Sequence, residues 1–178
     1  MTFSIRPATP ADAARVAEFA ARTFSDTYAA FNSPEDMAAH LSAAYSETKQ
    51  KKELADPAAA YVLAEEAGRL IGYGYVVLGH GPPGIPLDGP AELVRFYVAS
   101  GWHGRGVAQV LMTACVADAR RRGGRTLWLG VWQENPRAIA FYRKAGFRVV
   151  GTTSFRLGSQ VQADHVMVLP LDGAGAAA

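Results

Sequence analysis

The chain is poor in the residues that build disulfide frameworks and metal sites. Its 178 residues include a single cysteine, Cys115, so no internal disulfide can form. Cys115 falls on a predicted helix face shared with Val107 and Leu111, which is the spacing of a core residue rather than of an exposed nucleophile. The few histidines lack the close spacing of metal ligands, since they are scattered at His40, His80, His103 and His165. The sequence therefore predicts no metal site and no catalytic thiol.

Long apolar runs are missing too. No segment approaches the roughly 20 apolar residues that cross a bilayer, and the first residues lack the charged and apolar regions of a signal peptide. We therefore expect a cytoplasmic protein that does not contact a membrane. The length, with 49% hydrophobic and 19% charged residues, suits a single domain over residues 1–170. Residues 171–178, which end in GAGAAA, are expected to form a disordered tail.

The small net charge of +2 hides an uneven distribution. Residues 1–102 contain twelve acidic and eight basic residues, whereas residues 103–148 contain nine basic residues and only two acidic ones. The second segment suits an anionic partner such as a nucleotide or a phosphorylated cofactor, and the first could favour a cationic one. Nucleic acid is not expected as a partner, because the basic segment lacks interleaved aromatic residues and a helix-turn-helix pattern.

The hydrophobic periodicity predicts an α/β arrangement of seven strands and five helices. Thr9-Pro10 and Ser33-Pro34 are typical of helix starts. Residues 24–32 are expected to form a turn-rich connection, and the Gly- and Pro-rich residues 79–90 an irregular loop. Strands are expected at residues 3–6, 60–65, 70–78, 91–99, 125–132, 147–153 and 161–169, and helices from residue 10 to about 23 and at 37–45, 49–54, 107–122 and 136–144.

A strand that passes through a glycine-rich turn directly into a helix is the most informative segment. The turn, residues 103–108, reads HGRGVA. Glycine permits a positive φ and a close approach to a ligand, and the first helical N–H groups are unpaired at the positive end of the helix dipole, so this arrangement binds phosphate. No Lys-Ser or Lys-Thr follows, as a nucleoside-triphosphate loop requires, and Gln109 stands where a dinucleotide motif needs Gly or Ala.

A second motif lies further along the chain. Residues 127–147, LWLGVWQENPRAIAFYRKAGF, combine a strand, an Asn-x-x-Ala segment, a Phe-Tyr pair and a final Gly-Phe. Together with the HGRGVA turn, this segment resembles the GNAT superfamily of N-acetyltransferases. The coenzyme A loop of that superfamily reads Gln or Arg, any two residues, Gly, any residue, then Gly or Ala. The present turn departs from it only at His103, where the family has Gln or Arg.

The resemblance implies a mixed, mostly antiparallel α+β sheet of about seven strands flanked by helices, with a V-shaped splay between the fourth and fifth strands. The pantetheine arm of acetyl-CoA would lie in that splay and hydrogen-bond to the backbone of Val98. Asn135 precedes Pro136 and would also cap the helix that follows. The coenzyme site implied in this way comprises Tyr97, Val98, His103, Gly104, Arg105, Gly106, Val107, Ala108, Asn135 and Tyr142.

Transfer of an acetyl group from a thioester to an amine needs a base and an acid. The ammonium must lose a proton before it attacks, and the departing thiolate must gain one. The resemblance implies that Tyr142, near the coenzyme sulfur, is the acid. It implies that Glu92 is the base, acting through ordered water, with His80 and Asp88 as alternatives. Direct attack in a ternary complex is the expected route, because no activated nucleophile is present.

The acceptor site is marked less clearly. In the superfamily it comes from the first helices and the loop after the third strand, and we expect Tyr28, Glu92 and Trp132 to bind the substrate. Segments such as residues 23–28, TFSDTY, resemble the bacterial spermidine/spermine N-acetyltransferase branch linked to sporulation control (PaiA-like), which implies a polyamine acceptor. An aminoglycoside or a protein N-terminus as the acceptor, a coenzyme-binding sensor without turnover, and a homodimer all stay open.

Overall fold

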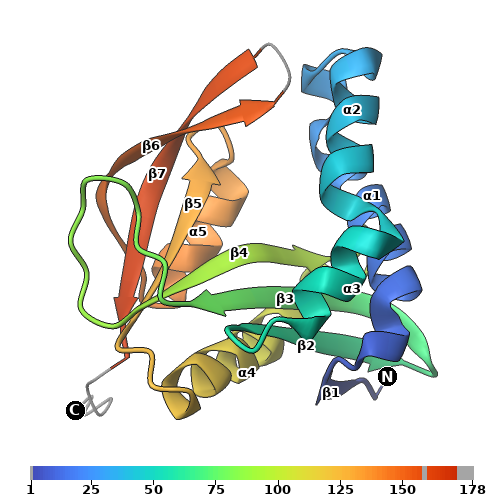
Figure 1. The fold of residues 1–178 in the computed structure, drawn as a ribbon, viewed down its shortest axis with the longest axis horizontal. Coiled ribbons are helices and arrows are strands. Elements are labelled where there is room, and N and C mark those ends of the chain that lie inside the picture. The colour runs from blue at the N-terminus through green and yellow to red at the C-terminus, as the bar shows by residue number, and fades with distance from the viewer. Residues whose placement is uncertain (1, 158–159, 172–178) are drawn as a thin grey trace.

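A computed structural model describes residues 2–157 and 160–171 of the chain. Its centre is a seven-stranded sheet in the order β1-β2-β3-β4-β5-β7-β6 (Figure 1). The strands are β1 (Ser4–Pro7), β2 (Ala59–Glu66), β3 (Arg69–Leu78), β4 (Pro90–Val98), β5 (Thr126–Trp132), β6 (Arg148–Leu157) and β7 (Gln160–Pro170). The α-helices are α1 (Ala13–Tyr28), α2 (Pro34–Tyr45), α3 (Glu47–Ala55), α4 (Val107–Arg121) and α5 (Pro136–Lys144). The expected α/β fold is confirmed.

Helices cover the two faces of the sheet unequally. Helices α4 and α5 contribute Leu111, Cys115, Ile139 and other residues to one core cluster, which also contains Leu129 of β5. On the opposite face α1, α2 and α3 cover the half of the sheet formed by β1 to β4 (Figure 1), and their side chains belong to a second cluster. The structure therefore separates an α4/α5 face from an α1–α3 face.

The pairing of β4 with β5 is short. All other neighbouring strands pair antiparallel, but β4 and β5 are parallel and share only the pairs Pro90–Thr126, Ala91–Leu127 and Glu92–Trp128. Beyond Glu92 the strand β4 stays with β3, while β5 turns away with β7 (Figure 1). A register shift on β4 at Val94 accompanies the divergence. The V-shaped splay expected between the fourth and fifth strands is confirmed.

The turn between β2 and β3 follows from local sequence. Ala67 and Gly68 both have positive φ, 46° and 77°, between the paired residues Glu66 and Arg69. Two central residues with positive φ match the right-handed twist of a two-residue hairpin. This turn joins the two strands expected at residues 60–65 and 70–78 as an antiparallel hairpin.

Two predicted boundaries were wrong. Helix α1 continues to Tyr28 instead of ending near Thr23, so only a short 3-10 helix, Ala29–Phe31, and the residues before α2 remain of the predicted connection. The extra turn is stabilised because Phe24 and Tyr28 share one helix face, with ring centroids 4.5 Å apart. At the C-terminal end, Leu171, assigned to the tail, is buried and its N–H donates to the Arg125 carbonyl. The rest of the predicted tail, residues 172–178, lies outside the described residues.

Within residues 2–157 and 160–171, no helix has both the length and the apolar character that spanning a membrane requires.

Candidate active site

The glycine-rich turn opens α4 at the point where β4 ends. Gly104 and Gly106 have φ values of 75° and 81°, and Gly106 is the N-cap residue of α4. A Cβ atom at either position would meet nothing within 4 Å. These glycines are therefore required by backbone conformation and not by lack of space.

The start of α4 presents unpaired N–H groups. The first backbone bond of the helix runs from the Val110 N–H to the Gly106 carbonyl, at 3.2 Å. The N–H groups of Val107, Ala108 and Gln109 precede this bond and have no backbone acceptor in the described part of the chain. Val107 is completely buried, whereas Ala108 is partly exposed and Gln109 is exposed, so the N–H groups of these two residues are the accessible donors. These donors at a helix N-terminus form an anion site.

Two basic side chains gather here, one from the turn itself and one from α5. The Arg105 guanidinium lies over the Trp102 ring at 5.4 Å, inside the turn itself. Arg137, in the first turn of α5, brings a guanidinium nitrogen within 3.4 Å of His103 Nε2. Sequence reasoning missed Arg137, which lies 32 residues after Arg105; only the packing of the two helix starts brings it here.

His103 binds back to the strand. Its Nε2 lies 2.8 Å from the Val98 carbonyl oxygen, a distance that requires this nitrogen to carry the proton and donate. The nearby Arg137 nitrogen is a donor too, so its 3.4 Å approach to Nε2 is a contact and not a second hydrogen bond. His103 stands where the resembled motif has Gln or Arg, and its side chain hydrogen-bonds to the Val98 carbonyl oxygen. We expect the backbone of Val98 to bind pantetheine.

Tyr142 projects from α5 into the splay between β4 and β5. Its ring packs edge-on against Phe96 of β4, its helix neighbour Phe141, and Phe147, at centroid distances of 6.4, 5.5 and 5.7 Å. Burial raises the pKa of Tyr142, and the charge of Tyr28, across the sheet on α1, raises it further. The hydroxyl therefore stays protonated at neutral pH and lies within electrostatic reach of the α1 side.

Asn135 holds the start of α5. Its side-chain oxygen accepts the Ala138 N–H at 3.1 Å, so the predicted helix cap is confirmed. The side-chain amide N–H groups of Asn135 have no hydrogen-bond partner among the described residues. Tyr97 lies differently from the other expected coenzyme residues: its ring packs with the α1–α3 cluster, so only its backbone can reach the α4/α5 side.

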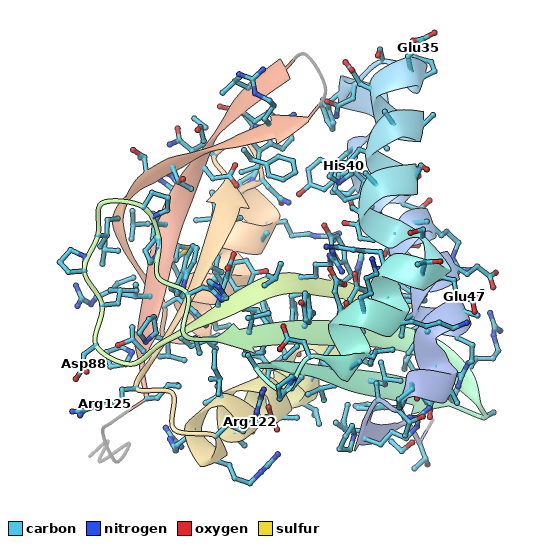
Figure 2. The ribbon with its side chains drawn as sticks, in the orientation of Figure 1. Glu35, His40, Glu47, Asp88, Arg122 and Arg125 are labelled. Atoms are coloured by element: carbon cyan, nitrogen blue, oxygen red, sulfur yellow. The ribbon has the colours of Figure 1, made fainter. Side chains whose placement is uncertain are left out.

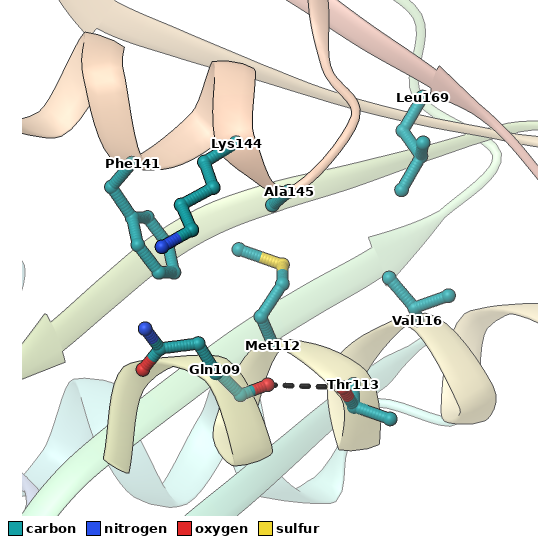
Figure 3. A pocket seen from close by; sticks show the side chains of 8 residues that line it. All are labelled: Gln109, Met112, Thr113, Val116, Phe141, Lys144, Ala145 and Leu169. Atoms are coloured by element: carbon teal, nitrogen blue, oxygen red, sulfur yellow. Dashed lines mark hydrogen bonds between the residues drawn. The ribbon is translucent and has the colours of Figure 1, made fainter. Parts of the chain in front are cut away.

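A groove of about 330 Å³ separates α4 from α5 (Figure 3). Its walls are mostly apolar, and Figure 3 shows the polar ends of Gln109 and Lys144 on the side nearer the start of α4. The groove is lined by Gln109, Met112, Thr113, Val116, Phe141, Lys144, Ala145 and Leu169.

Glu92 lies on the opposite face of the sheet. Its neighbours Ala91 and Leu93 point into the α4/α5 core, so strand alternation directs Glu92 to the α1–α3 face, beside its pairing partner Trp128. Burial raises the pKa of Glu92, and the nearby charge of His80 opposes that shift. A carboxylate with a raised pKa beside the splay is suited to accept a proton near neutral pH.

The two alternative bases are placed less well. The Asp88 side chain is 72% exposed and its carboxylate pairs with Arg125 at 3.1 Å, at the outer end of the loop between β3 and β4 (Figure 2). His80 is also exposed, and its carbonyl accepts the Trp128 indole N–H at 2.6 Å. The structure therefore brings Glu92, and not Asp88, to the splay.

Aromatic side chains from five elements gather on the same side of the sheet as Glu92. The Trp132 ring, at the end of β5, contacts Phe31 at 5.1 Å and Tyr28 at 6.2 Å. His40 of α2 stacks on Phe24 at 4.5 Å and approaches Phe155 of β6 at 5.8 Å, and Figure 2 shows His40 pointing from α2 toward the sheet. The predicted substrate residues Tyr28 and Trp132 are thus in contact.

Three carboxylates of the first half of the chain, Asp12, Glu53 and Glu65, are paired with arginines inside the fold. Asp12 and Glu65 share Arg6 and Arg15, at distances of 2.7 to 3.3 Å. The Glu53 carboxylate binds Arg95 at 2.7 Å under α3 and also accepts the Tyr61 hydroxyl at 2.5 Å. These three carboxylates are therefore neutralised by arginines inside the fold and do not contribute to a site for a cationic ligand.

Asp164 is a site residue that sequence reasoning missed. It lies on β7 opposite Trp132 of β5 and Thr153 of β6, on the same face as Glu92. Its Oδ1 is buried and has no hydrogen-bond partner among the described residues.

Cys115 is confirmed as a core residue. It is completely buried, and burial raises its thiol pKa to about 12.

Comparison with known proteins agrees with this geometry. The pattern of the Acetyltransferase (GNAT) family matches residues 21–147. An uncharacterised N-acetyltransferase of Mycobacterium tuberculosis is 38% identical over 160 residues, which cover 90% of this chain and 98% of that protein.

Two solved structures share the fold. The PaiA N-acetyltransferase of Thermoplasma acidophilum, solved with coenzyme A, has a TM-score of 0.78 at 23% identity, over 96% of this chain and 99% of that one. YncA, a putative acetyltransferase of Salmonella typhimurium solved with acetyl-CoA, has a TM-score of 0.64 at 23% identity, over 100% and 99%. With a family match over most of its length and a splayed sheet of the expected order, the chain belongs to the GNAT family and is an N-acetyltransferase.

Proposed function

We propose that this enzyme transfers the acetyl group of acetyl-CoA to a primary amine, by direct attack in a ternary complex. The observation that carries the proposal is that Tyr142 and Glu92 reach the same splay from opposite faces of the sheet. One face can thus hold the coenzyme and the other the acceptor, with a proton donor on the first side and a proton acceptor on the second.

The residues of the α4/α5 face fit acetyl-CoA as co-substrate. The free N–H groups at the start of α4 suit the pyrophosphate, with Arg105 and Arg137 adding positive charge. The groove between α4 and α5 suits a more apolar part of the coenzyme, and Lys144 at its edge an anionic one. Val98 binds the pantetheine arm once the His103 side chain has left its carbonyl oxygen.

The chemistry then needs a proton acceptor for the amine and a proton donor for the departing sulfur. Glu92 takes a proton from the acceptor ammonium through ordered water, and burial favours this by making its carboxylate more basic. The neutral amine attacks the thioester carbonyl carbon, the C–N bond forms, and the C–S bond breaks as the tetrahedral carbon collapses. The Tyr142 hydroxyl donates a proton to the departing sulfur, which leaves as the thiol of coenzyme A, and the proton that the newly acylated nitrogen loses restores the Tyr142 hydroxyl.

The acceptor we propose is a polyamine or a similar small cation. The aromatic side chains of Tyr28, Phe31 and Trp132 and the carboxylate of Glu92 support it, because organic ammonium groups bind aromatic faces and carboxylates. The similarity to the PaiA protein is a similarity of fold and does not identify the acceptor. Function in the cytoplasm and the organisation as a single acetyltransferase domain remain predictions.

The test is direct. The purified chain is incubated with acetyl-CoA and a panel containing spermidine, spermine, simple diamines, an aminoglycoside and a peptide with a free N-terminus, while thiol release and product mass are followed. Acetylation of the diamines and polyamines supports the acceptor. Acetylation of the aminoglycoside or the peptide alone contradicts it, and a chain that binds coenzyme A but acetylates nothing contradicts turnover itself.

A further inference from the structure

Asp164 differs from four other buried or partly buried carboxylates of the described residues because no arginine pairs with it. Asp12, Glu53, Glu65 and Asp118 are also at least partly buried, and each has an arginine within hydrogen-bond distance. Asp164 has no such partner in residues 2–157 and 160–171, and its Oδ1 makes no hydrogen bond there. A desolvated carboxylate without a donor costs free energy, so its retention calls for a ligand.

The backbone leaves room for this side chain to lie over the neighbouring strand. A Cβ atom at Gly130 of β5 would lie 3.3 Å from Asp164 Oδ2 and 3.9 Å from Thr153 Cγ2. The φ of Gly130 is not positive, so the glycine is needed here for space and not for conformation. The Asp164 carboxylate therefore extends over β5, toward the splay.

Aromatic side chains surround the same position. Trp132 pairs with Asp164 across the β5–β7 ladder, and its ring contacts Tyr28 and Phe31. Burial raises the pKa of Tyr28, and the charge of Asp164 is close enough to raise it further. Phe31 is 55% exposed, which places it at the outer edge of this group. A carboxylate flanked by aromatic faces is suited to an organic ammonium.

The distance from the reacting centre is informative. Glu92 pairs with Trp128, and Gly130, which Asp164 covers, lies two residues further along β5 on the same face. Two residues of a strand span about 7 Å. A substrate that reaches both carboxylates must therefore carry a second cationic group several bonds away from the amine that reacts.

We propose that Asp164, with Tyr28 and Trp132, binds the second ammonium of a diamine or polyamine acceptor and so determines specificity for acceptors with two cationic groups. This inference rests on the proposed acetyl transfer to a small cationic amine. It assigns Glu92 to the reacting amine and Asp164 to the distant one, on one continuous face of the sheet.

The experiment compares putrescine with n-butylamine, which have the same four-carbon chain and differ in the second ammonium. We expect Asp164→Asn to lower kcat/KM for putrescine by about 10-fold or more and to leave that for n-butylamine nearly unchanged. Asp26→Asn, which removes an exposed carboxylate from α1, controls for net charge and should change neither. Gly130→Ala keeps the carboxylate but crowds it, and should reduce the preference for putrescine in the same direction.

A binding measurement separates this inference from the proposed function. Putrescine is titrated calorimetrically into wild type and Asp164→Asn, both saturated with coenzyme A. Weaker binding to the variant supports the inference, whereas equal affinity, or no binding by the wild type, overturns it. If putrescine binds through Asp164 but is not acetylated, the inference stands and the proposed acceptor is wrong.

Discussion

The two faces of the splay offer different kinds of groups to the proposed ligands. On the α4/α5 face the central donors are backbone N–H groups at one helix start, held by Gly104 and Gly106. On the α1–α3 face the groups are side chains from widely separated elements, such as Tyr28 of α1, Glu92 of β4 and Asp164 of β7. A backbone site needs only the correct local conformation, whereas a side-chain site needs the whole fold.

This difference explains why one ligand is fixed and the other can vary. A change of almost any side chain near the start of α4 leaves its N–H groups in place, so coenzyme binding tolerates substitution. A change of Trp132 or Asp164 alters the shape and charge offered to the acceptor directly. Acceptor specificity can therefore drift on an unchanged fold.

Gly106→Pro should produce the largest effect, because it attacks the backbone site. Proline cannot adopt the φ of 81° at this position and also lacks an N–H group. We expect kcat/KM for acetyl-CoA to fall by about 10³-fold. Coenzyme A affinity, measured by calorimetry, should fall in parallel.

Gly101→Ala provides the matched control, since Gly101 has no positive φ and a Cβ atom there meets nothing within 4 Å. It should bind coenzyme A normally. Undiminished coenzyme affinity in folded Gly106→Pro, with folding checked by thermal denaturation, would show that the phosphate site lies elsewhere.

Tyr142→Phe tests the proton donor on the same face. The phenylalanine ring keeps the packing against Phe96, Phe141 and Phe147 but has no proton to give. Turnover should fall by about 10²-fold with little change in coenzyme A affinity. Wild-type turnover in Tyr142→Phe would show that Tyr142 packs the core and does not donate the proton.

Glu92→Gln tests the base on the opposite face. Burial raises the pKa of Glu92, so the wild type keeps this group protonated at low pH and gains activity as it deprotonates. Near neutral pH the variant should lose about 10- to 100-fold in turnover. The gap should narrow at alkaline pH, where the amine loses its proton unaided. A constant ratio of wild type to variant across the whole pH profile would contradict the role of base.

The contrast between the faces also decides what the sequence could predict. The HGRGVA turn and the Asn135 cap are local, so residue type and spacing were sufficient to predict them. The pairing of Glu53 with Arg95 joins α3 to β4 across 42 residues, and no sequence signal indicated it. Asp164 looked like one polar residue in an alternating strand, because its significance depends on Gly130 and Trp132 of another strand.

The smallest effect concerns the stability of Asp164→Asn. This measurement distinguishes a structural carboxylate from a ligand-binding one. Burial raises the pKa of Asp164 from its ordinary 3.8 to about 6, although the charge of His165 opposes the shift. The folded state therefore holds this proton more tightly than the unfolded state does, and wild-type stability falls as the pH rises from about 4 to about 6. Asparagine stays neutral and does not show this loss.

After allowance for solvent screening of the partly exposed group, the variant should be more stable than wild type by about 1 kcal/mol at pH 7, which raises Tm by about 2–4 °C. The two proteins should converge near pH 4, and saturating putrescine should reduce the difference at pH 7. Thermal denaturation at both pH values, with Asp26→Asn as the charge control, measures this. If Asp164→Asn is instead less stable than wild type at pH 7, the carboxylate has a stabilising partner within the fold, and its presence does not require a ligand.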